Sequence, residues 1–182
     1  GIELRNLTVG IIGFGNVGSR LAEVLHSFGC KIIAYDKYVS GYGSNEVEES
    51  SLEELQKRAD VISLHVPLNK YSLEMVNESF INKGAKPFFL LNLSRGSVVN
   101  ISDVVNGLES KKIRGLALDV LPNEKLDTLN DKESEEFDYL VNNENVIVTP
   151  HIGGLTKDSY KQLAEVLAKK IKKWDENNPL VN

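Results

Sequence analysis

Short apolar runs alternate with amphipathic stretches along most of the chain. Each run has three to five residues and shows no strict apolar–polar alternation, a pattern typical of strands buried on both faces. Buried strands of this kind favour a parallel sheet that is covered by helices. The six runs that predict strands are residues 8–12, 31–35, 61–64, 88–91, 115–118 and 146–148.

Between these runs, apolar side chains recur at the three- and four-residue spacing of amphipathic helices. Leu52 and Leu55 mark a short helix, and Thr156 is a suitable N-cap for a long helix near the end of the chain. We expect the apolar stripes of these helices to pack into the core. The longer stripes are Val17, Leu21, Val24, Leu25 and Phe28; Val104, Val105 and Leu108; and Tyr160, Leu163, Val166, Leu167, Ile171 and Trp174.

The repeated order of strand and helix predicts an α/β fold in three layers, with helices on both faces of a doubly wound parallel sheet. Six strands match the Rossmann-type architecture, in which a dinucleotide lies at the carboxyl ends of the strands. Residues 122–145 interrupt this rhythm with eight acidic residues and two lysines. We expect a surface excursion there, with a short helix near residues 135–141.

Length and composition narrow the class of protein. The 182 residues are enough for about one domain. A net charge of −5 disfavours partners such as nucleic acid or anionic membranes, and no apolar run approaches the ~20 residues of a membrane-spanning helix. The single cysteine, Cys30, excludes an internal disulfide and a multi-cysteine metal site. We therefore expect a buried Cys30 and no bound metal.

The ends of the chain bear on its origin. It opens on Gly1, and its only methionine is Met75, so we expect a processed or excised piece of a longer protein. The visible N-terminus lacks the charged, apolar and small-residue order of a signal peptide, although the residues upstream of it are not seen. We expect a cytoplasmic location.

A glycine-rich hexapeptide beginning at Gly13 fits the G-x-G-x-x-G pattern. It lies directly after the first predicted strand and opens the first predicted helix, which is the context that dinucleotide binding requires. Gly13 permits a tight turn, Gly15 lets the backbone approach a pyrophosphate, and Gly18 lets helix and strand pack closely. The free N–H groups around Asn16 and Val17 are expected to hold the phosphates.

Asp36 ends the second predicted strand, 18 residues after Gly18. An acidic residue at this place accepts hydrogen bonds from the adenine ribose and repels a 2′-phosphate. The sequence therefore predicts NAD rather than NADP as the cofactor. The neighbouring Lys37 acts in the opposite direction, because a cation softens that repulsion.

Three side chains suited to hydride-transfer chemistry follow three different strand ends. Arg95 follows the fourth strand, Glu124 lies beyond the fifth, and His151 follows the sixth. Histidine exchanges a proton near neutral pH, a nearby carboxylate stabilises its protonated form, and arginine presents a planar fork to a substrate carboxylate. We expect these residues to meet at the carboxyl edge of the sheet, where His65 lines the cofactor groove.

Five segments with these residues resemble a known family, and they occur in the family order over nearly the whole chain. The sequence resembles the NAD-binding domain of the D-isomer-specific 2-hydroxyacid dehydrogenases, and among its branches phosphoglycerate dehydrogenase is nearest. The matching segments are residues 9–18, 65–68, 92–96, 118–120 together with Glu124, and 149–154.

The resemblance implies an NAD-dependent oxidoreductase that moves a hydride between the cofactor and a D-2-hydroxy or 2-oxo acid. It implies that Arg95, Glu124 and His151 are catalytic and that Asp119 holds the nicotinamide end. The residues expected to contact NAD are Gly13, Gly15, Asn16, Val17, Gly18, Asp36, His65, Val66, Pro67, Leu93, Ser94, Arg95, Asp119, His151, Gly153 and Gly154.

Two residues depart from the family pattern. Lys125 stands where proline usually follows the glutamate, and Asn100 stands where an acidic residue is common. The first departure leaves Glu133 and Glu135 open as alternatives to Glu124.

The resemblance also sets the expected domain organisation. Residues 1–182 are expected to form the NAD-binding domain, without the substrate domain that the family builds mainly from upstream residues. We therefore expect little turnover from this chain alone and a homodimer in the full-length protein. The alternatives are a glyoxylate, hydroxypyruvate or D-lactate-type reductase and a non-enzymatic NAD-sensing, corepressor-like module. The positions of His151 and Arg95 disfavour a methyltransferase.

Overall fold

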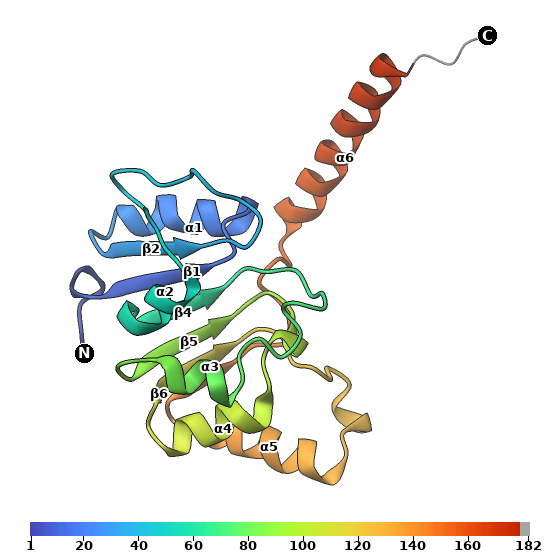
Figure 1. The fold of residues 1–182 in the computed structure, drawn as a ribbon. Helices are drawn as coiled ribbons and strands as arrows, with labels where there is room; N and C mark the ends of the chain where they lie inside the picture. The colour runs from blue at the N-terminus through green and yellow to red at the C-terminus, as the bar shows by residue number, and fades with distance from the viewer. Residues whose placement is uncertain (179–182) are drawn as a thin grey trace. The chain divides into compact units, whose positions relative to one another are not determined.

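The computed structural model describes residues 1–178, and within that range seven strands form one parallel sheet (Figure 1). The strand order is β3-β2-β1-β4-β5-β6-β7, and every neighbouring pair is parallel. The chain moves from β1 outward to β2 and then returns to the other side of β1 at β4. The strands are β1 (Thr8–Ile12), β2 (Lys31–Tyr35), β3 (Glu48–Glu49), β4 (Val61–Leu64), β5 (Phe88–Asn92), β6 (Ile113–Leu118) and β7 (Val146–Val148).

Two hydrophobic cores lie on opposite faces of this sheet, because successive side chains of a strand point to opposite faces. In β1, Ile11 joins the core beneath α1, whereas the next residue, Ile12, joins the core beneath the helices α2 to α5. The three-layer Rossmann-type prediction is therefore confirmed. The helices are α1 (Asn16–His26), α2 (Leu52–Arg58), α3 (Glu78–Lys83), α4 (Ile101–Glu109), α5 (Asp131–Asn142) and α6 (Lys157–Asn177).

The chain divides after Pro150 into two compact units, and each is described by itself. The first unit, residues 1–150, contains the whole sheet and the helices α1 to α5. The second unit begins at His151 and contains α6. Thr156 caps α6 as predicted, since its hydroxyl accepts a hydrogen bond from the Ser159 N–H at 3.0 Å.

The prediction for the apolar stripe of α1 is only partly right. Leu21 and Leu25 pack against the core, but Val17, Val24 and Phe28 are exposed. The residues of α1 that are fully buried are Gly18 and Ala22. A Cβ on Gly18 would lie 3.1 Å from the Ile11 side chain, so α1 approaches the sheet through small residues.

The prediction that the stripe of α6 packs into the core joins the two units, so it stays a prediction. Its six members are all between 49% and 68% exposed: Tyr160, Leu163, Val166, Leu167, Ile171 and Trp174. A single helix has no second layer against which to bury a stripe, and residues 151–178 contain no helix besides α6.

Three short elements were not predicted fully. Helix α5 spans residues 131–142 rather than 135–141, because Asn130 and Glu133 form a capping box that starts it earlier. It also packs on β7 and buries Leu140, so the 122–145 segment is more than a surface excursion. Helix α3 and strand β3 are six and two residues long, too short for a periodic pattern to reveal.

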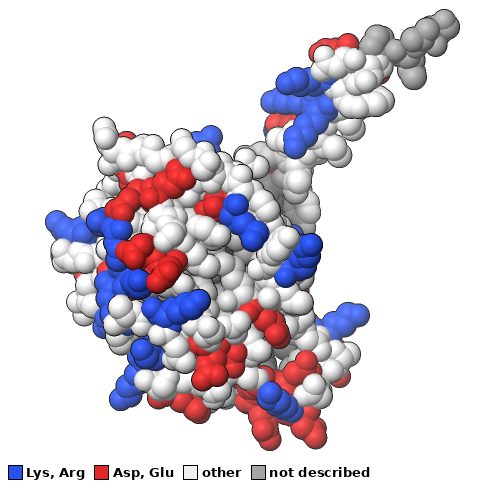
Figure 2. Space-filling view, viewed as in Figure 1, with Lys and Arg blue, Asp and Glu red and all other residues white. Residues whose placement is uncertain are grey.

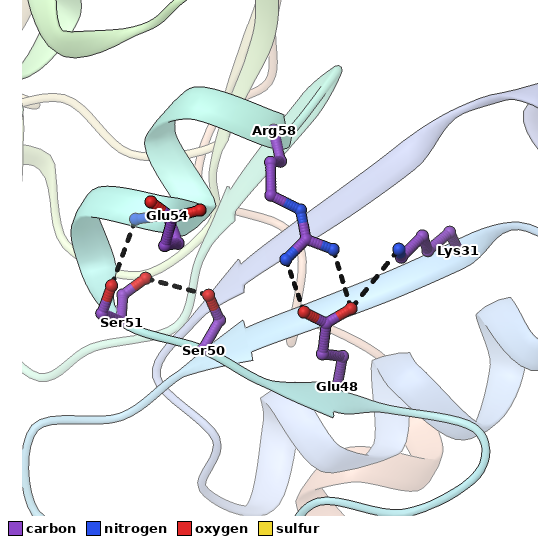
Figure 3. Close-up of polar contacts among 6 residues, drawn as sticks. All are labelled: Lys31, Glu48, Ser50, Ser51, Glu54 and Arg58. Carbon is purple, nitrogen blue, oxygen red and sulfur yellow. Dashed lines mark hydrogen bonds and ion pairs between the residues drawn. The ribbon is translucent and has the colours of Figure 1, made fainter.

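Strand β3 is held at the edge of the sheet by an ion-pair cluster (Figure 3). The Glu48 carboxylate accepts a 2.7 Å hydrogen bond from Arg58 Nη2, and Lys31 Nζ lies 3.4 Å from it. The Arg58 guanidinium, with Lys31, lowers the pKa of Glu48 to about 2. The cluster therefore joins β3 to α2 and to β2.

The described part of the chain also bears on the partner predictions. Cys30 is buried, as predicted, and no helix within residues 1–178 is long and apolar enough to cross a membrane. Figure 2 shows basic side chains interspersed with acidic ones on the face in view.

Candidate cofactor and catalytic site

The glycine loop lies where the strand order reverses, between the carboxyl ends of β1 and β4. In doubly wound sheets this reversal is the usual ligand crevice. Gly13 has φ +95°, and a Cβ there would lie 2.5 Å from the carbonyl oxygen of His65, which follows β4. Only glycine therefore fits at Gly13 without moving the backbone.

The other two glycines of the loop differ from each other. A Cβ on Gly18 would lie 2.1 Å from the Gly13 carbonyl oxygen, so Gly18 serves close packing within the protein. A Cβ on Gly15 would meet no atom within 4 Å, and Gly15 is exposed. The space above Gly15 is an open cradle that a side chain would fill.

Helix α1 starts directly at this cradle. Its N-cap is Gly15, which has no side chain to accept the first N–H groups of the helix. Asn16 and Val17 form the first exposed turn of the helix. The first N–H groups of α1 receive no side-chain cap, and they lie at the positive end of the helix beside the open cradle. This arrangement suits a pyrophosphate.

Asp36 directly follows β2 and is linked to the glycine loop. Its Oδ2 atom accepts a 2.8 Å hydrogen bond from the Phe14 N–H. Its Oδ1 atom accepts hydrogen bonds from the N–H groups of Tyr38 and Val39, at 2.8 and 3.0 Å. These three backbone N–H groups therefore fix the Asp36 carboxylate beside the glycine loop. The ring of Phe14, in the same loop, stacks on the ring of Tyr42 with 4.3 Å between the centroids.

A cavity of about 280 Å³ opens between the glycine loop, Asp36 and the segment after β4. Six of the predicted cofactor residues line it: Gly13, Gly15, Asp36, His65, Val66 and Pro67. Sequence reasoning did not assign the other lining residues to the cofactor: Tyr35, Lys37, Tyr38, Leu52, Asn69, Tyr71, Ser72 and Met75. Most of these follow β2 or β4, so their position after a strand end was the available signal.

His65 lines the cavity from the end of β4. The ring Nε2 atom of His65 lies 2.9 Å from the Ser63 hydroxyl. The backbone N–H of His65 donates to the Ile12 carbonyl oxygen at 2.7 Å. Burial lowers the pKa of His65 below its ordinary value of 6.5. The side chain is therefore neutral at pH 7 and can accept or donate a hydrogen bond.

The turn that carries Arg95 is positioned by a fully buried asparagine. Asn92 Oδ1 accepts hydrogen bonds from the N–H and the hydroxyl of Ser94, at 3.0 and 2.8 Å. Its Nδ2 atom donates to the Arg95 carbonyl oxygen at 3.0 Å. The Arg95 side chain is exposed, and so is Leu93. Asn92 was not assigned a role from the sequence, although a polar residue at the end of a buried strand is a usable signal.

The Arg95 turn touches the loop that carries Glu124. A Cβ on Gly96 would lie 2.0 Å from the Leu121 carbonyl carbon, so the two backbones are in contact. Asp119, at the end of β6, is buried and accepts a 2.6 Å hydrogen bond from the Thr149 hydroxyl. The ends of β5, β6 and β7 are thus joined at this edge.

Glu124 is exposed in a short ordered loop. Asn123 Oδ1 accepts a 3.1 Å hydrogen bond from the Lys125 N–H, which a proline at that position would lack. Of the two alternatives, Glu133 belongs to the capping box of α5, where its carboxylate accepts from the Asn130 N–H at 2.9 Å. Glu135 lies exposed on α5.

The remaining predicted site residues belong to the second unit. His151 has φ +53°, a left-handed conformation that is uncommon for residues other than glycine. His151, Gly153 and Gly154 are all exposed. The prediction that His151 meets Arg95 and Glu124 joins two units that are described separately, so it stays a prediction.

A larger cavity, of about 440 Å³, lies between α4, α5 and the loop after β6. Its lining includes the carboxylates Glu74, Glu133 and Glu136, together with one basic residue, Lys132. This negative lining does not suit an anionic 2-oxo acid. No group of three or more potential metal ligands was found among residues 1–178.

The sequence of the chain, including the glycine loop and Asp36, matches a known protein family. The model of the D-isomer specific 2-hydroxyacid dehydrogenase NAD-binding domain matches residues 1–153. The chain belongs to this family. Its cofactor is therefore NAD, and the open cradle at Gly15 and the fixed carboxylate of Asp36 fit that cofactor.

Relatives of known class agree with this assignment. An aromatic 2-oxoacid reductase of Clostridium sporogenes is 33% identical over 96% of the chain and 55% of its own length. A D-lactate dehydrogenase of Lactobacillus delbrueckii subsp. bulgaricus is 36% identical over 100% of the chain and 54% of its own length. The crystal structure of D-lactate dehydrogenase from Aquifex aeolicus, complexed with NAD and lactic acid, is 33% identical with a TM-score of 0.84 over 97% of the chain and 55% of its own.

These similarities revise the expected branch of the family. A phosphoglycerate dehydrogenase relative exists, from Schizosaccharomyces pombe, at 38% identity over 86% of this chain and 34% of its own length. Most of the similar proteins are instead D-lactate dehydrogenases and 2-oxoacid reductases. They favour the alternative expectation over the phosphoglycerate interpretation. The chain spans about half the length of the curated relatives that it matches.

Proposed function

We propose that the protein carrying this chain reduces a small 2-oxo acid to the D-2-hydroxy acid with NADH, in the manner of D-lactate dehydrogenases. One observation carries the proposal: the NAD cradle and the contact between the Arg95 turn and the Glu124 loop, made by the backbones of Gly96 and Leu121, lie at the same carboxyl edge of one sheet. Cofactor and substrate groups then meet along that edge. Residues 1–182 act as the NAD-binding domain, and a substrate domain and a second subunit complete the enzyme.

The cofactor residues divide by position along this edge. Gly15, Asn16 and Val17 hold the pyrophosphate through backbone N–H groups. Asp36 accepts hydrogen bonds from the adenine ribose, which favours NAD over NADP. His65, Val66 and Pro67 line the cavity beside Asp36. The residues that face the nicotinamide end are Leu93, Ser94, Arg95, Asp119, His151, Gly153 and Gly154.

Three side chains act on the substrate. NADH supplies the hydride to C2 of the oxo acid. Arg95 binds the substrate carboxylate and the carbonyl oxygen, which orients C2 and stabilises the negative charge that develops on the oxygen. Protonated His151 donates a proton to that oxygen, and Glu124 stabilises the protonated ring. In the reverse direction, neutral His151 removes the proton from the hydroxyl group.

The substrate is small and unphosphorylated in this proposal. The D-lactate and aromatic 2-oxoacid relatives support it, and Arg95 is the basic residue that the proposed catalytic set supplies. A phosphorylated substrate needs further cations, which would have to come from the substrate domain. A cytoplasmic location fits an enzyme whose cofactor and substrates are metabolites.

The test is an NADH oxidation assay on the protein that contains both this chain and its substrate domain. The panel is pyruvate, phenylpyruvate, hydroxypyruvate and 3-phosphohydroxypyruvate. We expect kcat/KM for pyruvate or phenylpyruvate to exceed that for the phosphorylated acid by at least tenfold. The reverse order would contradict the D-lactate assignment. Intact NADH binding without turnover of any oxo acid would favour a non-enzymatic NAD-sensing module.

A further inference from the structure

The cavity beside Asp36 has a cation–aromatic contact between two of its lining residues. Lys37 Nζ lies 4.1 Å from the centroid of the Tyr71 ring. The two residues come from different walls of the cavity, because Lys37 follows β2 and Tyr71 follows β4. Tyr71 is 55% exposed, so the contact lies at the solvent side of the cavity.

Both partners of this contact are held in place by their own loops. Asp36 accepts hydrogen bonds from the N–H groups of Tyr38 and Val39, which fixes the turn that directly follows Lys37. The Tyr71 N–H donates to Asn69 Oδ1 at 2.8 Å. The buried Ser72 hydroxyl donates to the Pro67 carbonyl oxygen at 2.6 Å and closes that turn. The contact therefore joins two loops that are already ordered.

The cavity of about 280 Å³ is present in the same structure as the contact between Lys37 and Tyr71. Its volume is at the lower end for small-molecule sites, which suits one part of a dinucleotide rather than the whole. Leu52, Val66 and Met75 give it apolar walls, and Asp36 gives it a carboxylate for the ribose. The cavity therefore offers apolar walls and a carboxylate beside the contact, which are the groups that a nucleoside needs.

We propose that Lys37 and Tyr71 form a clamp over the adenosine moiety of the cofactor. The contact links the two walls across the bound adenosine, so the loops do not separate and expose it to water. This inference rests on the proposed placement of adenosine beside Asp36. It adds Lys37 and Tyr71 to the residues that bind NAD.

A second lysine provides a matched control. Lys70 Nζ also approaches the Tyr71 ring, at 4.9 Å from the centroid. Lys70 is the chain neighbour of Tyr71, however, and it does not line the cavity. It carries the same charge near the same ring but does not link the two walls.

The experiment is calorimetric titration of the 182-residue chain with AMP and with uncharged adenosine. We expect Lys37→Met and Tyr71→Ala each to weaken binding of both probes by about three- to tenfold, since a partly desolvated cation–π contact is lost. Tyr71→Phe keeps the ring and should bind like the parent chain. Lys70→Met should change either affinity by less than about twofold. Thermal melts of each variant check the fold.

A double-mutant cycle separates a clamp from two independent contacts. In the Tyr71→Ala background, Lys37→Met should have almost no further effect. Independent, multiplying effects would overturn the clamp, and so would an equal loss from Lys70→Met. A Lys37→Met effect on AMP but not on adenosine would overturn it too, because Lys37 would then act on the phosphate.

Asp36→Ala distinguishes failure of the clamp from failure of the underlying placement. It should weaken adenosine binding by about tenfold, because it removes hydrogen bonds to a charged group. If Asp36→Ala weakens binding but the clamp variants do not, the clamp is wrong and the cofactor site stands. If Asp36→Ala leaves adenosine binding unchanged, adenosine does not lie beside Asp36, and the clamp fails with the placement.

Discussion

The proposed adenosine end and the proposed substrate end of the sheet edge are positioned by different parts of the chain. At the adenosine end, backbone does most of the positioning: the glycine loop leaves an open cradle, and three backbone N–H groups fix Asp36. At the proposed substrate end, the candidate catalytic residues Arg95 and Glu124 are exposed side chains on loops. Buried Asn92 donates to the Arg95 carbonyl oxygen, and buried Asp119 accepts a hydrogen bond from the Thr149 hydroxyl.

The difference follows from what each end must recognise. A pyrophosphate and a ribose are the same in every enzyme that binds NAD, so a fixed arrangement of N–H groups and one carboxylate suffices. A 2-oxo acid needs a proton donor and a cation at defined distances, and only side chains provide them. Changes at the two ends should therefore separate binding of the cofactor from turnover.

The largest expected effect is at the substrate end. In the protein that contains the substrate domain, His151→Ala should lower kcat for 2-oxo acid reduction by about 10²–10⁴-fold, because the proton donor is lost. The Kd for NADH, measured by fluorescence titration, should change by less than about threefold. Retention of full activity would contradict the proposed mechanism. A large loss of NADH affinity would show that the two ends are not separable.

Two alanine substitutions in the glycine loop distinguish its role in packing α1 on the sheet from its role in binding NAD. Gly18→Ala should lower the free energy of unfolding by at least ~2 kcal/mol, because the new Cβ clashes with the Gly13 carbonyl oxygen. Gly15→Ala should leave stability nearly unchanged, since no atom lies within 4 Å of its Cβ, but it should weaken NAD binding at least tenfold. Urea unfolding and calorimetry measure the two effects. Equal stability loss in both variants would remove the distinction.

At the adenosine ribose, Asp36→Ala should narrow the preference for NAD over NADP. Removing the carboxylate takes away hydrogen bonds to the ribose and the repulsion of a 2′-phosphate. We expect NAD affinity to fall by about tenfold and NADP affinity to rise or stay constant, both measured by calorimetry. If the parent chain binds NADP as tightly as NAD, Lys37 outweighs Asp36, and the cofactor assignment at this position is wrong.

The adenosine end was more predictable from sequence than the substrate end, for physical reasons. Gly13, Gly15 and Gly18 form a short motif directly after a strand, so their spacing is visible in the sequence although the steric reason differs between them. Asp36 is found by its distance from the loop. Lys37 and Tyr71, however, meet only because β2 and β4 flank β1, and no local pattern encodes that contact.

The exposed stripe of α6 shows the other limit of sequence reasoning. Tyr160 and Trp174 recur at helical spacing, and periodicity identifies a face to be covered. It does not identify the surface that covers it. The stripe of α1 shows a second limit: Val24 and Phe28 are exposed because Gly18 and Ala22 occupy the contact with the sheet.

A smaller effect is expected from His65, which lines the adenosine end. Its pKa is lowered by burial, so the folded chain binds less proton than the unfolded chain at pH values below about 6.5. The free energy of unfolding should therefore decrease as the pH falls below 6.5. His65→Gln should flatten this part of the pH profile, measured by urea unfolding between pH 5 and 8. An unchanged slope in the variant would assign the pH dependence to other groups.

The smallest effect is expected at β3, beyond the adenosine end. The Glu48 pKa is lowered to about 2, chiefly by its hydrogen bonds with Arg58. The ion pair therefore stabilises the fold above pH ~4.5, and this contribution is lost as the pH falls toward 2. Because both side chains are about a third or more exposed, Glu48→Gln should cost no more than ~1 kcal/mol at pH 7. Salt should reduce that cost, as in any exposed ion pair.

The affinity of Glu48→Gln for NAD tests whether the adenosine end depends on this ion pair. If backbone contacts alone hold the adenosine end, Glu48→Gln should leave the Kd for NAD unchanged, although it loosens the edge strand next to β2. Glu53→Gln, which removes an exposed pair with Lys57 inside α2, is the matched control. A several-fold loss of NAD affinity in Glu48→Gln but not in Glu53→Gln would mean that Arg58 and Lys31 help to hold the loop after β2. The adenosine end would then depend on side-chain ion pairs, as the substrate end depends on its side chains.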